Sequence, residues 1–137
     1  MLHLHDLKVG DLVRAEFEQK EYEGTVEQIS FEKVEVLHES NDQLNWYDPK
    51  DLDPVPLTED KLSFLGFVKS TDPELNGEGQ AWVRGPFILT YLKKGDSQHI
   101  LLNCQSEEPR LIKTGLFVHE LQHHYHGMTK VFLEFEP

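Results

Sequence analysis

The sequence predicts an α+β protein in which an N-terminal SH3-like small β-barrel precedes a small antiparallel sheet packed by one main C-terminal helix. Short segments of alternating polar and apolar residues fill the first part of the chain, and a second group occupies residues 67–102. One long amphipathic segment lies near the C-terminus. We expect a barrel at residues 1–57 and an α+β subdomain at residues 58–137, and it stays open whether they pack as one compact unit.

Length and charge narrow the range of functions. A chain of 137 residues can bury a hydrophobic core without disulfide bonds. The net charge of -12 comes from 25 acidic and 13 basic residues, and an acidic surface repels phosphate backbones. Nucleic acid is therefore a disfavoured partner, although a DNA mimic would also be acidic.

The sequence also indicates a compartment. Cys104 is the single cysteine, which excludes an internal disulfide and favours a reducing compartment. The N-terminus lacks the basic and apolar regions of a signal peptide, and no apolar run approaches the roughly 20 residues that span a bilayer. We expect a soluble cytoplasmic protein without a membrane segment.

The first 57 residues have the pattern of short strands. In residues 12–17, Val13, Ala15 and Phe17 alternate with polar neighbours, as a half-buried strand requires. Similar patterns predict strands at 25–29, 33–37 and 44–47, and a tight turn or single helical turn at 48–52. Four or five short strands in so short a stretch are typical of an SH3-like barrel or a strongly curved sheet. Such a shape hosts many unrelated functions.

The second part begins with a short helix. Thr58 is a suitable N-cap for a helix over 59–65, and Gly66 is suited to end it. Further patterns predict a loop at 72–79, a turn at 94–97 and a helix of about 114–127, with strands at 67–69, 81–84, 87–92, 99–102 and 131–135.

Five residues of the predicted helix spell the zinc-protease pattern H-E-x-x-H. Histidines at positions i and i+4, here His119 and His123, share one helix face and can bind one zinc ion. The intervening Glu120 would act as the general base on a zinc-bound water. The pattern therefore names one chemistry, metal-assisted hydrolysis.

The rest of the sequence offers no clear third ligand. His124 and His126 lie too close along the helix to act as a ligand from another element, and Glu134 and Glu136 lie on or beside the predicted terminal strand. The longer pattern H-E-x-x-H-x-x-G-x-x-H also fails, because His126 occupies the glycine position.

Helix geometry divides the segment into two faces. At about 100° per residue, the predicted core-facing arc contains Phe117, Val118, Leu121, His124, Tyr125 and Met128. The opposite side contains His119, Gln122, His123 and His126, which we expect to face solvent unless the barrel covers them.

We interpret the second set as a polar helix face with no catalytic residue, cofactor or metal ion. Two alternatives remain. One is a catalytic zinc site at His119 and His123 with Glu120, and the other is an adventitious metal site at His119, His123 and His126.

Residues 118–125, V-H-E-L-Q-H-H-Y, together with P-V-P-L-T-E at 54–59 and L-G-F at 65–67, resemble a family of uncharacterised Bacteroidota proteins. Its members are often prophage- or mobile-element-associated and end in a helix of the type V-H-x-L-Q-N/H-x-Y. The resemblance spans residues 10–129, but His126-Gly127 stands where relatives often carry an apolar pair.

The resemblance implies that His119, Leu121, Gln122 and Tyr125 define the helix, whereas Glu120 and His123 are replaceable. A zinc protease cannot lose those two residues. We therefore expect a non-enzymatic protein-interaction module of mobile-element origin, whose partner is a protein. The alternatives are a zinc-dependent hydrolase that uses the HELQH motif and a nucleic-acid-associated barrel. The sequence does not indicate an oligomeric state.

Trp46 and Tyr47 are a further candidate for a recognition surface. Neighbouring residues of a strand point to opposite faces of the sheet. The pair either forms an aromatic surface on the barrel or places one of its side chains inside.

Overall fold

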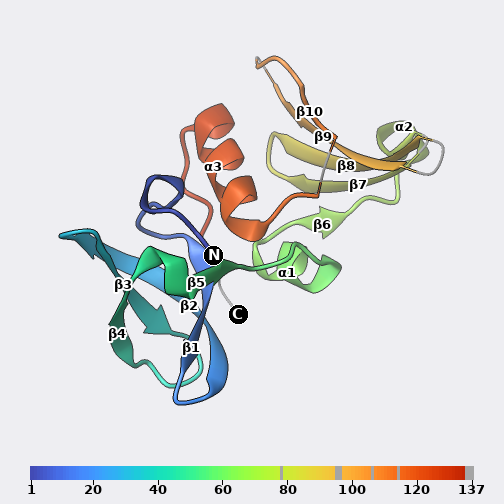
Figure 1. Ribbon diagram of the computed structural model, residues 1–137. Coiled ribbons are helices and arrows are strands. Elements are labelled where there is room, and N and C mark those ends of the chain that lie inside the picture. Colours follow the sequence, from blue (N-terminus) through green and yellow to red (C-terminus); the bar gives the residue numbers. More distant parts are fainter. Residues whose placement is uncertain (78, 95–96, 106, 114, 135–137) are drawn as a thin grey trace.

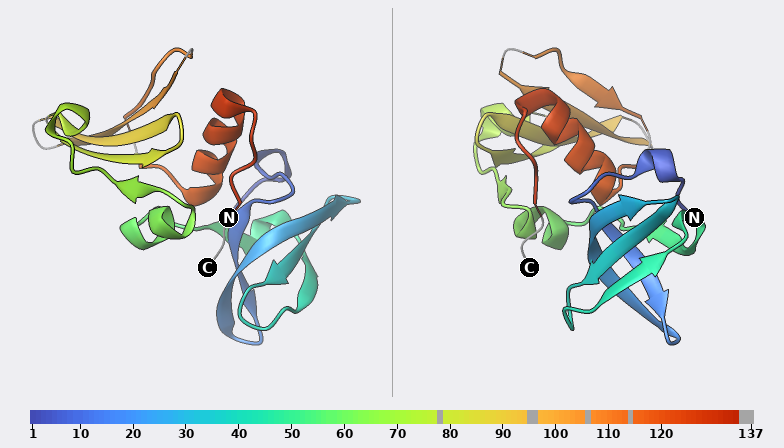
Figure 2. Two further views of the ribbon diagram at one scale, coloured as in Figure 1. Left: turned by 180° about the vertical axis from the view of Figure 1, so that it is seen from behind. Right: turned by 90° about the vertical axis from the view of Figure 1, so that its left-hand side faces the viewer.

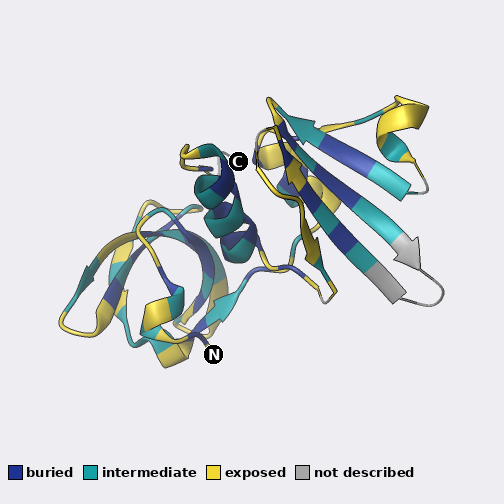
Figure 3. Ribbon diagram, turned by 90° about the horizontal axis from the view of Figure 1, so that it is seen from above, coloured by how far each residue is buried: buried dark blue, intermediate teal, exposed yellow. Residues whose placement is uncertain are grey.

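Two antiparallel sheets and one main C-terminal helix form an α+β fold, as predicted (Figure 1). The computed structural model describes residues 1–77, 79–94, 97–105, 107–113 and 115–134. The helix α3 (Val118–Thr129) lies between the two sheets, as Figures 2 and 3 show from other sides. Among the described helices, none combines the length and the apolar character that a membrane span needs.

The N-terminal sheet is a curved meander with one added edge strand. Its strands have the order β4-β3-β2-β1-β5, and the 3-10 helix η2 (Pro49–Asp51) connects β4 to β5. Within the described residues β4 and β5 do not pair, so the sheet is open where a closed barrel was one expectation. The bounds are β1 (Leu12–Phe17), β2 (Lys20–Ser30), β3 (Lys33–His38), β4 (Leu44–Tyr47) and β5 (Leu52–Pro54).

Alternate residues of these strands point to the same face of the sheet, and on that face their apolar side chains form a small separate hydrophobic core. Val13 and Ala15 point inward with Val26, Val34 and Val36 of the neighbouring strands. The 3-10 helix η1 (Leu4–Asp6) precedes β1, and Leu2 and Leu7 on either side of it close this core. The predicted strands were therefore correct in place, and β2 is longer than expected.

The C-terminal sheet has the order β10-β9-β8-β7-β6. The helices α1 (Glu59–Phe64) and α2 (Pro73–Asn76) flank β6, and α2 lies within the predicted loop. The tip of the predicted turn at 94–97, residues 95–96, lies outside the described residues. The bounds are β6 (Val68–Lys69), β7 (Gly79–Arg84), β8 (Phe87–Lys94), β9 (Ser97–Cys104) and β10 (Arg110–Ile112).

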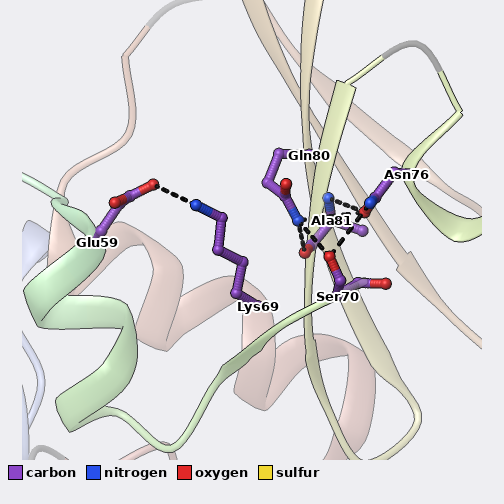
Figure 4. A network of polar contacts seen from close by, with 6 residues as sticks. All are labelled: Glu59, Lys69, Ser70, Asn76, Gln80 and Ala81. Atoms are coloured by element: carbon purple, nitrogen blue, oxygen red, sulfur yellow. Dashed lines mark hydrogen bonds and ion pairs between the residues drawn. The ribbon is translucent and has the colours of Figure 1, made fainter. Parts of the chain in front are cut away.

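A network of amide groups fixes α2 against β7 (Figure 4). The Gln80 side-chain amide donates to the carbonyl of Ser70 at 2.8 Å and lies 3.2 Å from Oδ1 of Asn76. Asn76 Oδ1 also accepts the N–H of Ala81 at 2.9 Å. These bonds provide partners for the Ser70 carbonyl, the Ala81 N–H and the Asn76 side chain.

The apolar face of α3 packs on the C-terminal sheet, as predicted. Val118, Leu121, Tyr125 and Met128 are buried in a core with Phe87 and other residues of that sheet. Phe117 and His124, which were assigned to the same face, are more exposed because they lie at its start and its margin.

The ends of α3 differ from the prediction. The helix begins at Val118 and not at residue 114, because Phe117 is extended and acts as its N-cap. The predicted strand at 131–135 is wrong for its described part, since residues 131–134 form no strand and residue 135 lies outside the described residues. Lys130 has a left-handed conformation with φ of 65° and turns the chain back along the helix.

A cluster of charged side chains, in which two carboxylates are neighbours, lies on the outer face of the N-terminal sheet. Glu39 has Glu23 beside it, and Lys61 of α1 forms an ion pair with Glu23. Burial and the charge of Glu23 raise the pKa of Glu39 to about 7, and Lys61 offsets only part of this. The folded protein therefore binds a proton at Glu39 between about pH 4.5 and pH 7, where the unfolded chain releases it.

The raised pKa of Glu39 predicts that Glu39→Gln increases the free energy of unfolding by an amount that depends on pH. Because the folded pKa is raised, the charged carboxylate destabilises the fold as pH increases through this window. We expect Glu39→Gln to stabilise the protein by about 1 kcal/mol at pH 8 and to have little effect at pH 4.5. Urea unfolding at the two pH values measures this, with Glu27→Gln at an exposed position as control. A loss of stability at pH 8 would contradict the assignment.

Candidate functional site

The H-E-x-x-H residues lie on the first turns of α3, on the side that faces the N-terminal sheet. His119 and Gln122 are each only 5% exposed. We expected this face to meet solvent unless the barrel covers it, and the covered case holds for both residues. The start of β1 and the C-terminal tail bind Gln122, and residues of the N-terminal segment line the cavity beside His119. His123 and His126 are partly buried.

The Gln122 amide joins three segments of the chain. Its Oε1 accepts the backbone N–H of Leu12 at 2.9 Å. Its Nε2 donates to the carbonyl of Gly10 at 2.9 Å and to the carbonyl of Leu133 at 2.8 Å. One side chain thus satisfies backbone groups at the start of β1 and in the tail after α3, of which those of Leu12 and Leu133 would otherwise be buried without this partner.

His123 pairs with a buried carboxylate from the other end of the chain. Its Nε2 lies 2.7 Å from Oδ2 of Asp11, which is 3% exposed. The same oxygen accepts the N–H of Lys8 at 2.9 Å. No local sequence pattern connects Asp11 with His123 across 112 positions.

Glu120 has a structural partner. Its Oε1 accepts the backbone N–H of Phe117 at 2.9 Å, so it closes the first turn of α3 as the third residue of a capping box does. The spacing of Glu120 from the N-cap is a sequence signal that identifies this role once the helix start is known. The hydrogen bond to Phe117 turns the carboxylate toward the helix terminus.

His119 is buried next to His123. The two ring centroids are 5.7 Å apart with nearly perpendicular planes. Burial lowers the pKa of His119 below its ordinary value of 6.5, and the nearby carboxylate of Asp11 opposes this only in part. Among the described residues, Nδ1 of His119 has no hydrogen-bond partner.

The other histidines of the helix are directed elsewhere. His124 lies with Nδ1 2.9 Å from the guanidinium of Arg110, and His126 stacks on Phe132 with centroids 4.2 Å apart. The histidines at 119, 123 and 126 are therefore not brought together as one ligand set. In the part of the chain that the structure describes, no three His, Cys, Asp or Glu side chains are arranged to hold a metal ion.

Two cavities border this face. One of about 420 Å³ lies between α3 and the tail, and its lining includes Val9, Phe132 and Leu133 beside the His123–Asp11 pair. The other, of about 530 Å³, lies between η1 and the start of α3 and reaches His119 and Glu120. The polar face of α3 is thus bordered by two hollows that are partly open to solvent.

The aromatic pair on β4 is divided between the two faces of the sheet. Tyr47 points inward, and its hydroxyl lies 2.7 Å from Nε2 of the buried His38. Trp46 points outward and is 47% exposed, and Leu44 beside it is 52% exposed. One residue of the pair therefore packs inside, while the other remains on the surface.

The chain matches no protein-family model, no curated protein and no solved structure.

The three bonds of Gln122 predict a large loss of stability in Gln122→Ala. Truncation leaves two buried backbone groups and one half-buried backbone group without their side-chain partner, so we expect a loss of about 3 kcal/mol. Urea unfolding followed by circular dichroism measures this change. Gln28→Ala, at an exposed position of β2, is the matched control and should change stability by less than about 0.5 kcal/mol. An equally small effect of Gln122→Ala would refute the assignment.

Proposed function

We propose that the protein is a non-enzymatic protein-interaction module. The observation that carries this proposal is the use of Glu120, the expected general base, as the cap of α3. Gln122 and His123 of the same motif also have structural partners, in Leu12 and Asp11. The motif therefore fastens a helix between two sheets, and the exposed surfaces of those sheets are left for binding.

We also propose that the N-terminal sheet is an SH3-like barrel in its open form. The order β4-β3-β2-β1-β5, the strong curvature and the helical turn before β5 support this proposal. Membership of the Bacteroidota family and the mobile-element origin rest on the resemblance of the V-H-x-L-Q helix. The cytoplasmic location is supported by the single, buried Cys104.

One observation favours the zinc-hydrolase alternative. Asp11 brings a carboxylate next to His123, and the His119 ring adjoins that of His123, although the three side chains are not arranged to hold a metal ion. Zinc binding there would have to replace the bond between His123 and Asp11. Catalysis would also require Glu120 to leave Phe117, which would open the first turn of α3. The geometry therefore supports this function less well.

The nucleic-acid alternative is opposed by charge. The chain carries a net charge of -12, and the outer face of the N-terminal sheet presents Glu35, which has no ion pair among the described residues. A phosphate backbone would be repelled by this face.

Metal analysis of the purified protein tests the proposal. We expect substoichiometric zinc after dialysis, with or without prior incubation with zinc sulfate. We expect the free energy of unfolding of Glu120→Gln to lie within about 0.5 kcal/mol of the wild-type value, because a glutamine oxygen can still accept the Phe117 N–H. One zinc ion per chain that is lost in His123→Ala, but kept in His3→Ala at an exposed position, would overturn the proposal in favour of the hydrolase.

A further inference from the structure

Strand β4 is one of the two edge strands of the N-terminal sheet, and the other, β5, accepts a hydrogen bond from the N–H of Leu2 on the N-terminal segment. The neighbour of β4 on one side is β3, and among the described residues no strand pairs with its other side. Figure 1 shows this edge on the far side of the sheet from α3 and the C-terminal sheet. An edge strand presents backbone N–H and C=O groups that can bind a further extended chain.

The hydrogen-bond pattern identifies which residues face outward. His38 donates its N–H to the carbonyl of Gln43 at 2.8 Å, so alternate residues of β4 after Gln43 also bond to β3. These are Asn45 and Tyr47. The backbone groups of Leu44 and Trp46 therefore point to the open edge, and no other backbone hydrogen bond of the described residues uses them.

The side chains of the same two residues form an exposed apolar surface. Leu44 and Trp46 are each about half exposed, on the outer face of the sheet. Trp46 lies directly opposite Glu35 of β3. Hydrogen-bonded and non-hydrogen-bonded pairs alternate along antiparallel strands, so Trp46 and Glu35 form a non-hydrogen-bonded pair. In such a pair the two side chains approach most closely. Among the described residues Glu35 has no ion pair, whereas nearby Lys33 is bound to Asp48.

An indole ring beside an unpaired carboxylate is suited to a cationic side chain. A lysine or arginine can lie against the aromatic face and pair with the carboxylate at once. We propose that β4 binds an extended segment of a partner protein, which adds to the edge of the sheet and places a lysine or arginine at Trp46 and Glu35. This inference rests on the proposed interaction function and names the partner's chemistry.

Charge selects a basic partner over a second copy of this chain. Two copies joined at β4 would bring together two surfaces that each carry Glu35 and Glu39, in a chain of net charge -12. Like charges across strands are destabilising. A basic extended segment meets the same surface with complementary charge.

A fluorescein-labelled peptide of alternating lysine and valine, titrated with the full-length protein and followed by anisotropy, tests this proposal. We expect binding that weakens with salt, and no binding of the matched glutamate–valine peptide. Trp46→Ala should weaken binding about fivefold and Glu35→Gln about threefold. Glu74→Gln, on the distant helix α2, makes the same change in net charge and should have no effect.

A proline tests the backbone part of the proposal. Because the N–H of Leu44 faces the open edge, Leu44→Pro removes a donor for the incoming strand but no bond to β3. We expect Leu44→Pro to bind the peptide more weakly than Leu44→Ala, while circular dichroism shows both variants folded.

Equal affinity of all variants for the cationic peptide would show non-specific attraction to an acidic protein and would overturn the proposal. Absence of binding would also overturn it. A dimer in sedimentation equilibrium that Leu44→Pro dissociates would identify a second copy as the occupant instead. None of these binding results depends on zinc content. The non-enzymatic function can therefore stand when the peptide-binding proposal fails, and peptide binding at β4 can be observed when the zinc test fails.

Discussion

The side-chain amide of Gln122 is the interaction on which the arrangement of the fold depends. It binds the backbone at Gly10 and Leu12 on one side and at Leu133 on the other. Because the Leu12 and Leu133 bonds are buried and the Gly10 bond is half-buried, the helix cannot leave the N-terminal sheet without exposing these backbone groups or leaving them unpaired. Leu12 reinforces the contact, since its side chain belongs to the core that α3 shares with the C-terminal sheet.

This constraint explains why a helix with a polar face is buried on two sides. Its apolar side meets the C-terminal sheet through dispersion and burial, and its polar side meets β1 through a small number of directed bonds. The residues that spell H-E-x-x-H are members of this second contact or of the helix cap. The resemblance to a zinc site thus arises from the residue types that a polar, buried helix surface requires.

Local patterns predicted much of this structure. The alternation of polar and apolar residues located the strands around Val13 and Val36. The angular positions of residues around the predicted helix identified Leu121 and Tyr125 as core residues. The interpretation failed where partners lie far apart in the chain. The pair of Asp11 with His123 spans 112 positions, so its existence depends on how two halves of the chain pack. The terminal strand failed for a similar reason, because Gln122 takes the Leu133 carbonyl that a sheet would have used.

Hydrogen exchange of the Leu12 amide tests the central role of Gln122 most directly. That amide lies at the first residue of β1, where exchange by fraying would be rapid without a strong acceptor. If Gln122 Oε1 holds it, the Leu12 amide should be protected as strongly as the buried Leu121 amide, which donates to the carbonyl of the N-cap Phe117 in the first turn of α3. Rapid exchange at Leu12 with full protection at Leu121 would show that α3 is stable without this bond and would contradict the account.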